Sequence, residues 1–400
     1  MSRLFFPLLV LSLVACCIEV DISVPGFPDM ARYFAVGEGE IQLTVAVNFA
    51  GFCLAALVYG PLSEAYGRRP LMVIGNLIMV LGAVGCVLAP DLPLLLLARF
   101  FQGVGASASA VIVFAMIADA YQGEKSARLI GVMNSFLTTA MALAPVLGGF
   151  INEAIGWRGN YGVVALVTVV SWVLLVLYLP ETRQERDIIS VRKITADFKQ
   201  LLSSGRFMVY AIVPSTCGAA YFAFIACAAF LYQQTYQVNI VEYSLHQGII
   251  VGAFSLVSSF SSNFSSRMGR HRSLMIGGAM GIGGALLMLT LSLLGECEAF
   301  ATTLSMVLFA SGAAIVYPLI FASSLEIFPN IRGAASSLIM SFRSLLISLS
   351  IALMGYFYNG TAYNVALIIL GIMIVAFALT LLILKFEKAD IKAEAQRAFS

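Results

Sequence analysis

The chain has 400 residues, of which 60% are hydrophobic and 11% are charged, and its formal net charge at pH 7 is +2. This composition lies far outside the range of soluble globular proteins. It predicts a polytopic membrane protein, and the small positive charge gives no indication of nucleic-acid binding.

Apolar runs of about 20 residues, the length that crosses about 30 Å of hydrocarbon as a helix, recur throughout the chain. They predict twelve transmembrane helices, at residues 4–24, 41–62, 71–89, 93–118, 128–150, 161–180, 207–230, 244–262, 273–294, 299–323, 332–355 and 363–386. The eighth span is the least sharply bounded, because its Ser-rich end, from Ser255 to Ser266, lowers the hydropathy. The predicted fold class is an all-α membrane protein.

The N-terminal segment admits a second interpretation, because Arg3 and the apolar run to Leu13-Val-Ala-Cys16 also resemble a lipoprotein signal peptide. We favour a retained helix, since the apolar character continues to Pro25. Most of the seven cysteines lie within apolar spans, which predicts buried packing residues and no disulfide framework or metal site.

The first and fourth spans carry charged residues, which are costly inside a membrane and usually mark an ion or substrate path. Glu19 and Asp21 lie in the first span, and Arg99 lies in the fourth. Asp21 and Arg99 should lie at a similar depth, roughly 6–9 Å below the outer surface at about 1.5 Å per residue, so contact between them is possible. Such a carboxylate could hold or release a proton as the helices rearrange, and a static ion pair is the alternative.

Glu19 is harder to place than Asp21. Two positions on a helix correspond to roughly 200° of rotation, so both acids cannot face one cavity unless the helix is distorted near Pro25. Glu19 is then either a second proton site or a partner packed against neighbouring helices.

Residues 181–206 form the longest polar stretch between spans and separate six spans from six. The predicted domains are a six-helix bundle at 1–180, a linker at 181–206, a second bundle at 207–386 and a tail at 387–400. Gly67-Arg68 after the second span recurs as Gly269-Arg270 after the eighth, and internal repeats of this kind are typical of transporter folds.

Arg343 lies eleven residues into its span, about 16 Å deep, near the midplane where transporters bind substrates. It could attract an anionic or electron-rich group, or it could be held by backbone carbonyls at a helix bend. Other side chains expected to line a substrate pocket are Asn48, Asn134, Thr138, Tyr221, Phe224, Tyr232 and Tyr317. Aromatic residues in membrane proteins also serve packing, so that alternative stays open for each of them.

Lys and Arg accumulate in cytoplasmic loops, so their distribution predicts the orientation. With the N-terminus inside, all but four of the 23 Lys and Arg fall on the cytoplasmic side. Arg99 and Arg343 lie within spans, and Arg32 and Arg158 face outward. We therefore expect a multi-pass protein of the cell inner membrane with both termini cytoplasmic.

Several motifs resemble those of the major facilitator superfamily. The segment Gly60-Pro-Leu-Ser-Glu-Ala-Tyr-Gly-Arg-Arg-Pro70 resembles the family's G-x-x-x-D-R-x-G-R-R loop, with Glu64 in place of Asp and Ala65 in place of a basic residue. Arg99-Phe-Phe-Gln-Gly-Val-Gly105 is similar to the family's R-x-x-Q-G-x-G. The fifth span follows the spacing of an exporter-associated motif, with Ala replacing Gly twice, at Gly131, Ala140, Ala144, Pro145, Gly148 and Gly149.

A narrower resemblance, to the Bcr/CflA-type proton-coupled drug exporters, rests on four further segments. They are Asp21-Ile-Ser-Val-Pro25, Tyr59-Gly-Pro61, Arg332-Gly-Ala-Ala-Ser-Ser337 and Phe342-Arg343. The resemblance implies two pseudo-symmetric six-helix bundles and a proton-coupled antiporter that exports small amphipathic compounds by alternating access. It also places Asp21 at the family's acidic site, with Glu19 and Arg99 as further candidates for proton coupling.

The resemblance implies that the proton gradient supplies the energy and that no cofactor is needed. The expected partners are protons, a small-molecule substrate and the lipid bilayer, and a monomer is the simplest assembly. A dedicated metabolite or siderophore exporter, or a proton symporter for uptake, would use the same scaffold. An enzyme is not expected, because the sequence has no phosphate-binding Gly-Lys-Ser/Thr loop and only two histidines.

A final set of residues is predicted to act as gates. Glu64 could stabilise a helix N-terminus and meet Arg332 across the halves, while Arg68 could meet Asp119 and latch the cytoplasmic side, although Arg68 and Arg69 could also serve only to set topology. Small residues and Pro145 in the fifth span would let helices seal the outer side. The predicted gating residues are Gly60, Glu64, Gly67, Arg68, Arg69, Asp119, Pro145, Gly148, Gly149 and Arg332.

Overall fold

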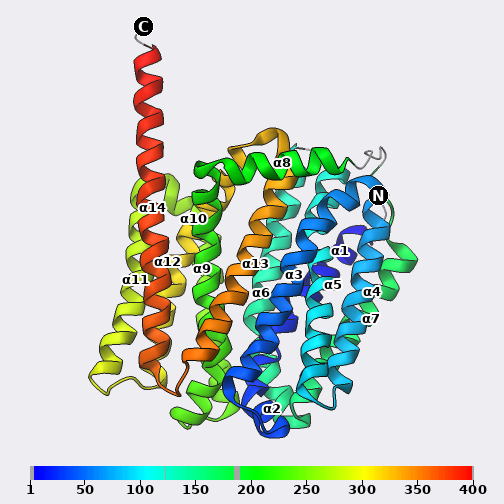
Figure 1. Cartoon of the computed structure of the whole chain (residues 1–400), viewed down its shortest axis with the longest axis vertical. Coiled ribbons are helices and arrows are strands. Elements are labelled where there is room, and N and C mark those ends of the chain that lie inside the picture. The colour runs from blue at the N-terminus through cyan, green and yellow to red at the C-terminus, as the bar shows by residue number, and fades with distance from the viewer. Residues whose placement is uncertain (1–3, 122, 184–189, 399–400) are drawn as a thin grey trace.

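All regular elements in the described residues are helical, and twelve of the helical segments are long and apolar enough to cross a membrane. The computed structural model describes residues 4–121, 123–183 and 190–398 (Figure 1). The predicted fold class, an all-α membrane protein with twelve spans, is therefore confirmed.

The first six spans gather on one side of the molecule, in blue to green in Figure 1. Their elements are α1 (Phe5–Asp21), the 3-10 turn η1 (Val24–Gly26), α2 (Phe27–Phe34), α3 (Glu38–Tyr66), α4 (Arg68–Leu88), α5 (Leu92–Ala120), α6 (Gly123–Ile155) and α7 (Trp157–Tyr178). Small residues set the spacing of these helices. A Cβ at Gly51 of α3 would lie 2.2 Å from the Phe100 carbonyl oxygen of α5, so these two helices approach backbone to backbone.

The last six spans gather on the other side, in green to red. Their elements are α9 (Gly205–Phe230), the π turn η2 (Leu231–Thr235), α10 (Ile240–Met268), α11 (Arg270–Leu293), α12 (Ala299–Glu326), the 3-10 turn η3 (Pro329–Ile331), α13 (Arg332–Phe357) and α14 (Ala362–Ala398). Close packing through glycine recurs here, since a Cβ at Gly312 of α12 would lie 2.4 Å from the Gly277 carbonyl oxygen of α11.

The two ends of the molecule differ in what they carry. Both ends of the described chain and the connecting helix α8 (Val191–Ser203) lie at one end, which we call the terminal end. The short helix α2 lies at the opposite end, which we call the α2 end (Figure 1).

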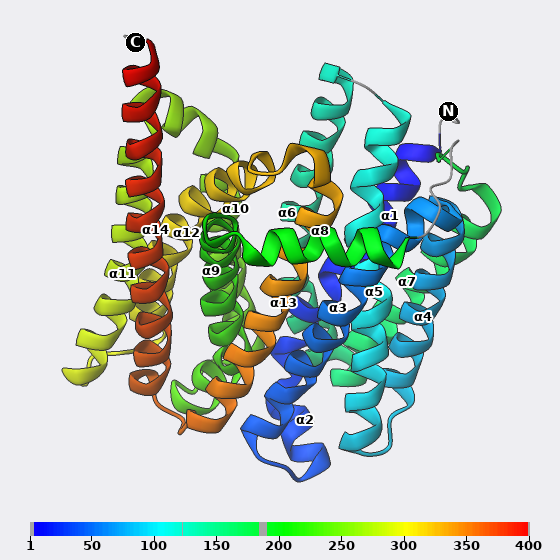
Figure 2. The same ribbon diagram turned by 45° about the horizontal axis from the view of Figure 1, so that its top comes forward.

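The two sets of six spans meet along two helix pairs. Helices α3 and α13 lie side by side in both views (Figure 1, Figure 2). Near the middle of this pair Ser341 Oγ donates a 2.9 Å hydrogen bond to the Cys53 carbonyl oxygen. In the second pair, Ser255 Oγ of α10 donates a 3.3 Å hydrogen bond to the Thr138 carbonyl oxygen of α6. We call each set of six spans a half, and we call the boundary between the halves, which includes these two helix pairs, the seam.

The predicted internal repeat is visible in the backbone. Gly67 between α3 and α4 has a φ of +106°, and Gly269 between α10 and α11 has a φ of +84°. Residues with a Cβ rarely adopt such angles, so glycine lets two long helices follow each other without a loop. Each glycine is followed by an arginine that begins the next helix, Arg68 or Arg270.

The first and eighth spans extend beyond their predicted ends. The first span continues past residue 24 through η1 and α2 to Phe34, because Pro25 and Pro28 lie at the first turns of these elements, where proline is tolerated. The eighth span begins earlier, since the Asn239 side chain caps α10 by accepting from the Glu242 amide at 2.9 Å. Its Ser-rich end stays helical to Met268, with Ser259 Oγ bonded to the Ser255 carbonyl oxygen at 2.8 Å.

The predicted linker and tail both contain helix. Helix α8 begins after Ser190, whose hydroxyl accepts from the Lys193 amide at 3.2 Å, and Ser204 caps α9 in the same way at Phe207. Helix α14 runs to Ala398, beyond the predicted end of the last span at residue 386. The polar segment after the span is rich in Ala, Glu and Lys, which favour helix in water.

Candidate functional site

The charged residues of α1 and α5 form a buried polar cluster within the first half. Arg99 Nη1 lies 3.3 Å from Glu19 Oε2 and donates a 2.9 Å hydrogen bond to Gln102 Oε1. Asn48 Nδ2 donates to Glu19 Oε1 at 3.1 Å, and the Arg99 guanidinium lies 5.7 Å from the centre of the Tyr161 ring. All five residues are at most 2% exposed. The cluster balances the charge of Glu19 and satisfies both of its carboxylate oxygens.

The predicted contact between Asp21 and Arg99 is wrong, because Arg99 pairs with Glu19. Helix α1 is continuous through Asp21, so the two acids point to faces roughly 200° apart and only one can reach α5. Asn48, predicted to line the substrate pocket, is held instead by Glu19 and by the Arg99 carbonyl oxygen at 3.2 Å. Two members of the cluster had no role predicted from the sequence, Gln102, which is part of the Arg99 motif, and Tyr161.

Asp21 points away from this cluster and toward the second half. It is 2% exposed, and neither carboxylate oxygen has a hydrogen-bond partner among the described residues. Its charge acts on the hydroxyls of Tyr221 in α9 and Tyr243 in α10. The Tyr243 hydroxyl also has no partner, whereas the Tyr221 hydroxyl accepts a 3.3 Å hydrogen bond from Gln247 Nε2. An acid without a balancing cation therefore lies at the seam between the halves.

Close packing at the α2 end surrounds Asp21. A Cβ at Gly148 of α6 would lie 2.2 Å from the Ile22 carbonyl oxygen, and one at Gly149 would lie 2.1 Å from Ser244 Oγ of α10. Gln233 Nε2 donates a 2.9 Å hydrogen bond across the halves to the Pro25 carbonyl oxygen. Pro145 lies inside α6, one turn before these glycines. The halves are thus in contact around Asp21.

The other end of α6 is much more open. Gly131 has no atom within 4 Å of a Cβ built on it, and Asn134 is exposed and has no hydrogen bond among the described residues. Thr138 bonds within its own helix, to the Ser135 carbonyl oxygen at 3.2 Å. Asn134 therefore lies beyond the closely packed part of the seam, toward the terminal end, whereas Thr138 lies at the seam, where its carbonyl oxygen accepts from Ser255 Oγ.

Of the aromatic residues predicted to line the substrate pocket, some are packed inside the second half and others lie at the seam. Phe224 and Tyr232 are at most 1% exposed, and the Tyr232 hydroxyl shares a 2.6 Å hydrogen bond with Thr303 inside the second half. Tyr221 faces the seam near Asp21. Tyr317 accepts a 3.1 Å hydrogen bond from Arg343 Nη1 and stacks on Phe321.

The predicted contact between Arg68 and Asp119 is present at the terminal end. Arg68 Nε lies 2.9 Å from Asp119 Oδ2, and its Nη1 donates to Ser63 Oγ at 2.6 Å. These residues belong to α4, α5 and α3, so the pair joins three helices of one half and does not cross the seam.

Glu181, just after α7, caps the start of α4. Its Oε1 accepts from the Arg68 amide at 3.0 Å, and its Oε2 accepts from the Arg69 amide at 3.1 Å. The Arg69 side chain in turn donates to the Val176 carbonyl oxygen at 2.8 Å. A carboxylate at the positive end of a helix is stabilising, and Glu181 fills the position expected of Glu64. The sequence offered no signal for this, because Glu181 lies more than 100 residues away.

The predicted pair of Glu64 and Arg332 is not formed in this arrangement of the halves, since no ion pair joins these two described residues. Glu64 Oε1 instead faces the start of α13, 3.3 Å from where a Cβ at Gly333 would lie. Gly60 approaches Ser337 of the same helix, with 2.6 Å between a built Cβ and Ser337 Oγ. Small residues, not an ion pair, bring α3 and α13 together here.

The second half repeats the arginine site. Arg270, which begins α11, lies 3.0 Å from Glu387 of α14 and donates to the Leu319 carbonyl oxygen at 3.0 Å. Each half therefore anchors the arginine after its repeated glycine to an acid on another helix of that half.

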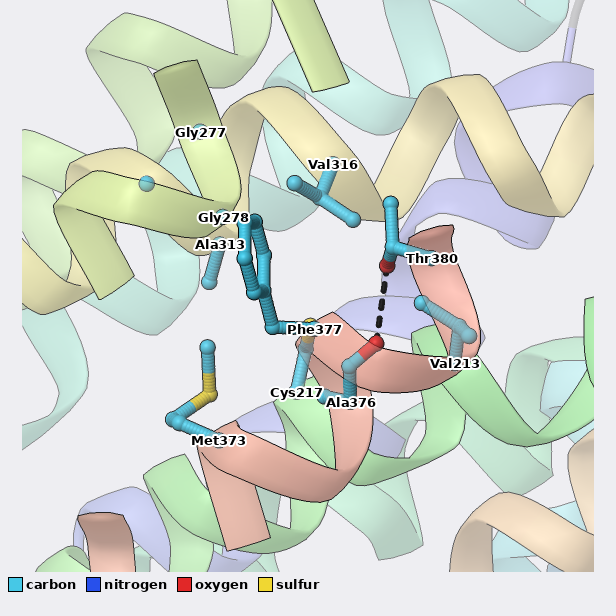
Figure 3. Close-up of a pocket in the computed structure, with 11 residues that line it drawn as sticks. Val213, Cys217, Gly277, Gly278, Ala313, Val316, Met373, Ala376, Phe377 and Thr380 are labelled. Atoms are coloured by element: carbon cyan, nitrogen blue, oxygen red, sulfur yellow. Dashed lines mark hydrogen bonds between the residues drawn. The ribbon is translucent and has the colours of Figure 1, made fainter. Parts of the chain in front are cut away.

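Two cavities lie outside the polar cluster. The first, of about 10 Å³, is an apolar crevice of the second half where Phe377 of α14 lies against Gly278 of α11 and Met373 also lines the wall (Figure 3). The second, of about 170 Å³, lies at the terminal end between α3, α8 and the start of α13, where Glu64, Lys193 and Asp197 line it. No group of three or more His, Cys, Asp or Glu within the described ranges could hold a metal ion.

The pattern of the Major Facilitator Superfamily matches residues 9–351 of the chain. The chain belongs to the Major Facilitator Superfamily. A bicyclomycin resistance protein homolog of Haemophilus influenzae is 24% identical over 327 residues, which are 81% of this chain and 82% of that protein. The multidrug resistance protein MdtL of Escherichia coli O157:H7 is 26% identical over 319 residues, 80% of each protein. The predicted resemblance to Bcr/CflA-type drug exporters is thereby confirmed.

The superfamily fold is confirmed by solved structures. The xylose transporter XylE of E. coli superposes with a TM-score of 0.72 at 16% identity, over 94% of this chain and 97% of that chain. The superfamily and these relatives are transporters, which agrees with the prediction that the chain is not an enzyme. The chain is thus a multi-pass membrane transporter of this superfamily.

Proposed function

We propose that this transporter is a proton-coupled antiporter that exports small amphipathic compounds by alternating access. Two relatives named for bicyclomycin or multidrug resistance support export of drug-like compounds. We place the protein in the cell inner membrane as a monomer, with the terminal end cytoplasmic. The proton gradient supplies the energy, and no bound cofactor takes part.

The observation that carries the proposal is the state of Asp21. Its two carboxylate oxygens are buried without a hydrogen-bond partner, at a seam that any rocking of the halves must alter. Burying an ionised carboxylate without a cation is unfavourable, whereas the protonated acid can be buried at much lower cost. The closed α2 end therefore suits protonated Asp21, and an end open to water suits its ionised form.

This preference supports a coupled cycle. A proton taken up by Asp21 from outside would favour closure of the α2 end and exposure of the site to the cytoplasm. If substrate binding there expels the proton, the ionised acid would drive the α2 end open and the substrate outward. Glu19 and Arg99 balance each other's charge within one half, so in this scheme their contact does not change as the halves move.

The proposal is tested by proton release from purified protein. A panel of amphipathic compounds is added to wild-type protein and to Asp21→Asn in weakly buffered detergent solution, and the pH is recorded. We expect at least one compound that binds both proteins to release protons from the wild type only. Asp91→Asn is the matched control, because Asp91 caps α5 at an exposed position and asparagine is an equally good cap.

Two results would contradict this mechanism. Compounds that bind without proton release from either protein would exclude antiport through Asp21. Proton release that persists in Asp21→Asn and is lost in Glu19→Gln would move the proton site to Glu19.

A further inference from the structure

Arg343 is a charged residue near the middle of α13. Its side chain is half-buried and runs along α9, where Gly218 leaves room for it. A Cβ at Gly218 would lie 3.6 Å from Arg343 Cγ. Met340, about one turn before Arg343 on α13, packs against the first-half cluster that contains Cys16 and Phe52. Arg343 therefore lies at the seam between the halves, at the depth where these transporters close around their substrates.

Arg343 is not held by backbone carbonyls. Its one hydrogen bond to the described residues runs from Nη1 to the Tyr317 hydroxyl at 3.1 Å, and its Nε is buried without a partner. No described Asp or Glu lies within ion-pair distance of it. The sequence left open that backbone carbonyls hold Arg343 at a helix bend, and these contacts contradict that role.

The neighbouring charges leave Arg343 without compensation. Arg99, the other arginine inside the membrane, is balanced by Glu19, whereas Arg343 has only a neutral phenol beside it. Asp21 does not pair with Arg343 either, since neither of its carboxylate oxygens has a hydrogen-bond partner among the described residues. An unpaired guanidinium inside a membrane is costly, and its planar fork fits an oxyanion with two oxygens.

We propose that Arg343 and Tyr317 form a subsite for an acidic group, so that the favoured substrates are amphipathic anions. The carboxylate or sulfonate of such a compound binds the free N–H groups of Arg343, and Tyr317 holds the guanidinium toward the seam. The apolar body of the compound lies between the halves. This inference rests on the proposed export function and adds the chemical class of its substrate.

The test compares binding of matched acids and amides. Two pairs, 1-naphthoate with 1-naphthamide and 4-phenylbenzoate with 4-phenylbenzamide, are measured by equilibrium dialysis against the protein in phosphatidylcholine nanodiscs, with empty nanodiscs as background. These nanodiscs contain no lipid of net negative charge that could occupy the subsite. We expect the wild type to bind at least one acid about tenfold or more tightly than its amide, as for hydrogen bonds to a charged group.

Three variants assign the preference to Arg343. Arg343→Gln should bring the acid-to-amide ratio near one, mainly by weakening the binding of the acid. Tyr317→Phe should lower the ratio by a smaller factor. Arg343→Lys keeps the charge and should retain part of the preference, so the subsite is still tested if the Gln variant does not fold. The matched control is Arg272→Gln, because Arg272 is exposed at the start of α11 and its loss changes the net charge equally.

The outcomes separate the subsite from the export mechanism. The subsite is overturned if the wild type binds neither acid more tightly than its amide. It is also overturned if the acid-to-amide ratio is the same in the wild type and in Arg343→Gln. Proton release by a neutral amide in that case would leave the antiport mechanism intact. An acid preference that depends on Arg343, without proton release by any compound, would support the subsite and contradict antiport.

Discussion

Glu19 of α1 and Arg99 of α5 lie 3.3 Å apart, and each is at most 2% exposed. Removing one partner of a buried pair leaves the other charge uncompensated, which typically costs about 3–5 kcal/mol. We expect Glu19→Gln and Arg99→Gln each to lower the free energy of unfolding by roughly that amount, and the double variant to lower it by less than the sum. Denaturant unfolding in detergent measures this.

The matched control for this pair is Glu153→Gln, at an exposed position near the end of α6. It should change stability by no more than about 0.5 kcal/mol. Additive losses in the double variant would mean that Glu19 and Arg99 do not depend on each other, and would argue against a balanced pair.

Gly148 and Gly149 permit the contact of the halves at the α2 end. A methyl group at Gly148 would meet the Ile22 carbonyl oxygen at 2.2 Å, and backbone cannot move aside as easily as a flexible side chain. We expect Gly148→Ala to destabilise the closed α2 end by about 1–3 kcal/mol, as overpacking does, and to slow transport. Gly131→Ala, where no atom lies within 4 Å, is the control.

The state of the α2 end can be followed by double electron–electron resonance between spin labels at Leu88 and Leu294. Both residues are exposed, one at the end of α4 and one just after α11, in opposite halves. The label distance should increase in Gly148→Ala and stay constant in Gly131→Ala, in a background without native cysteines. Equal distances in all three proteins would show that Gly148 is not needed for closure.

The spans could be predicted because hydropathy is a property of consecutive residues, and the twelve predicted spans correspond to the twelve observed. The ends of the helices could not be predicted in the same way, because capping by Asn239 or Ser190 depends on single side chains. Which residues meet across helices was partly predictable. Arg68 and Asp119 lie at helix ends of similar depth, whereas the choice between Glu19 and Asp21 depends on the rotation of α1 about its axis. Nothing in the hydropathy fixes that rotation.

The Arg68–Asp119 pair and the Glu181 cap should support the first half without controlling the seam. Asp119→Asn weakens a hydrogen bond to a charged group, and Glu181→Gln weakens a charged cap at α4, so each should cost about 1–3 kcal/mol of stability. The distance between labels at Leu88 and Leu294 should not change. Gly148→Ala, in contrast, should change the distance between these labels. A shifted distance distribution in Asp119→Asn would mean that the Arg68–Asp119 pair takes part in gating.

Closure at the α2 end should depend on pH through Asp21. The ionised share of a carboxyl group grows as pH rises, and the ionised form is disfavoured where the carboxylate is buried without a hydrogen bond or an ion pair, as Asp21 is among the described residues. We expect the population of the open α2 end to grow from acidic to alkaline pH in the wild type, as measured by the labels at Leu88 and Leu294. Asp21→Asn carries no charge at any pH and should stay closed throughout.

Tyr243→Phe refines this prediction, because the Tyr243 hydroxyl lies within range of the Asp21 charge and has no hydrogen-bond partner among the described residues, so that a small movement would let it donate to the ionised acid. Removing that hydroxyl makes the site still less tolerant of the ionised acid, so opening should begin at a lower pH than in the wild type. Tyr358→Phe, which removes another buried hydroxyl without a partner from the second half, is the matched control and should follow the wild type. If Asp21→Asn opened with pH as the wild type does, a different acid would control the α2 end, and Glu19 would be the next to replace.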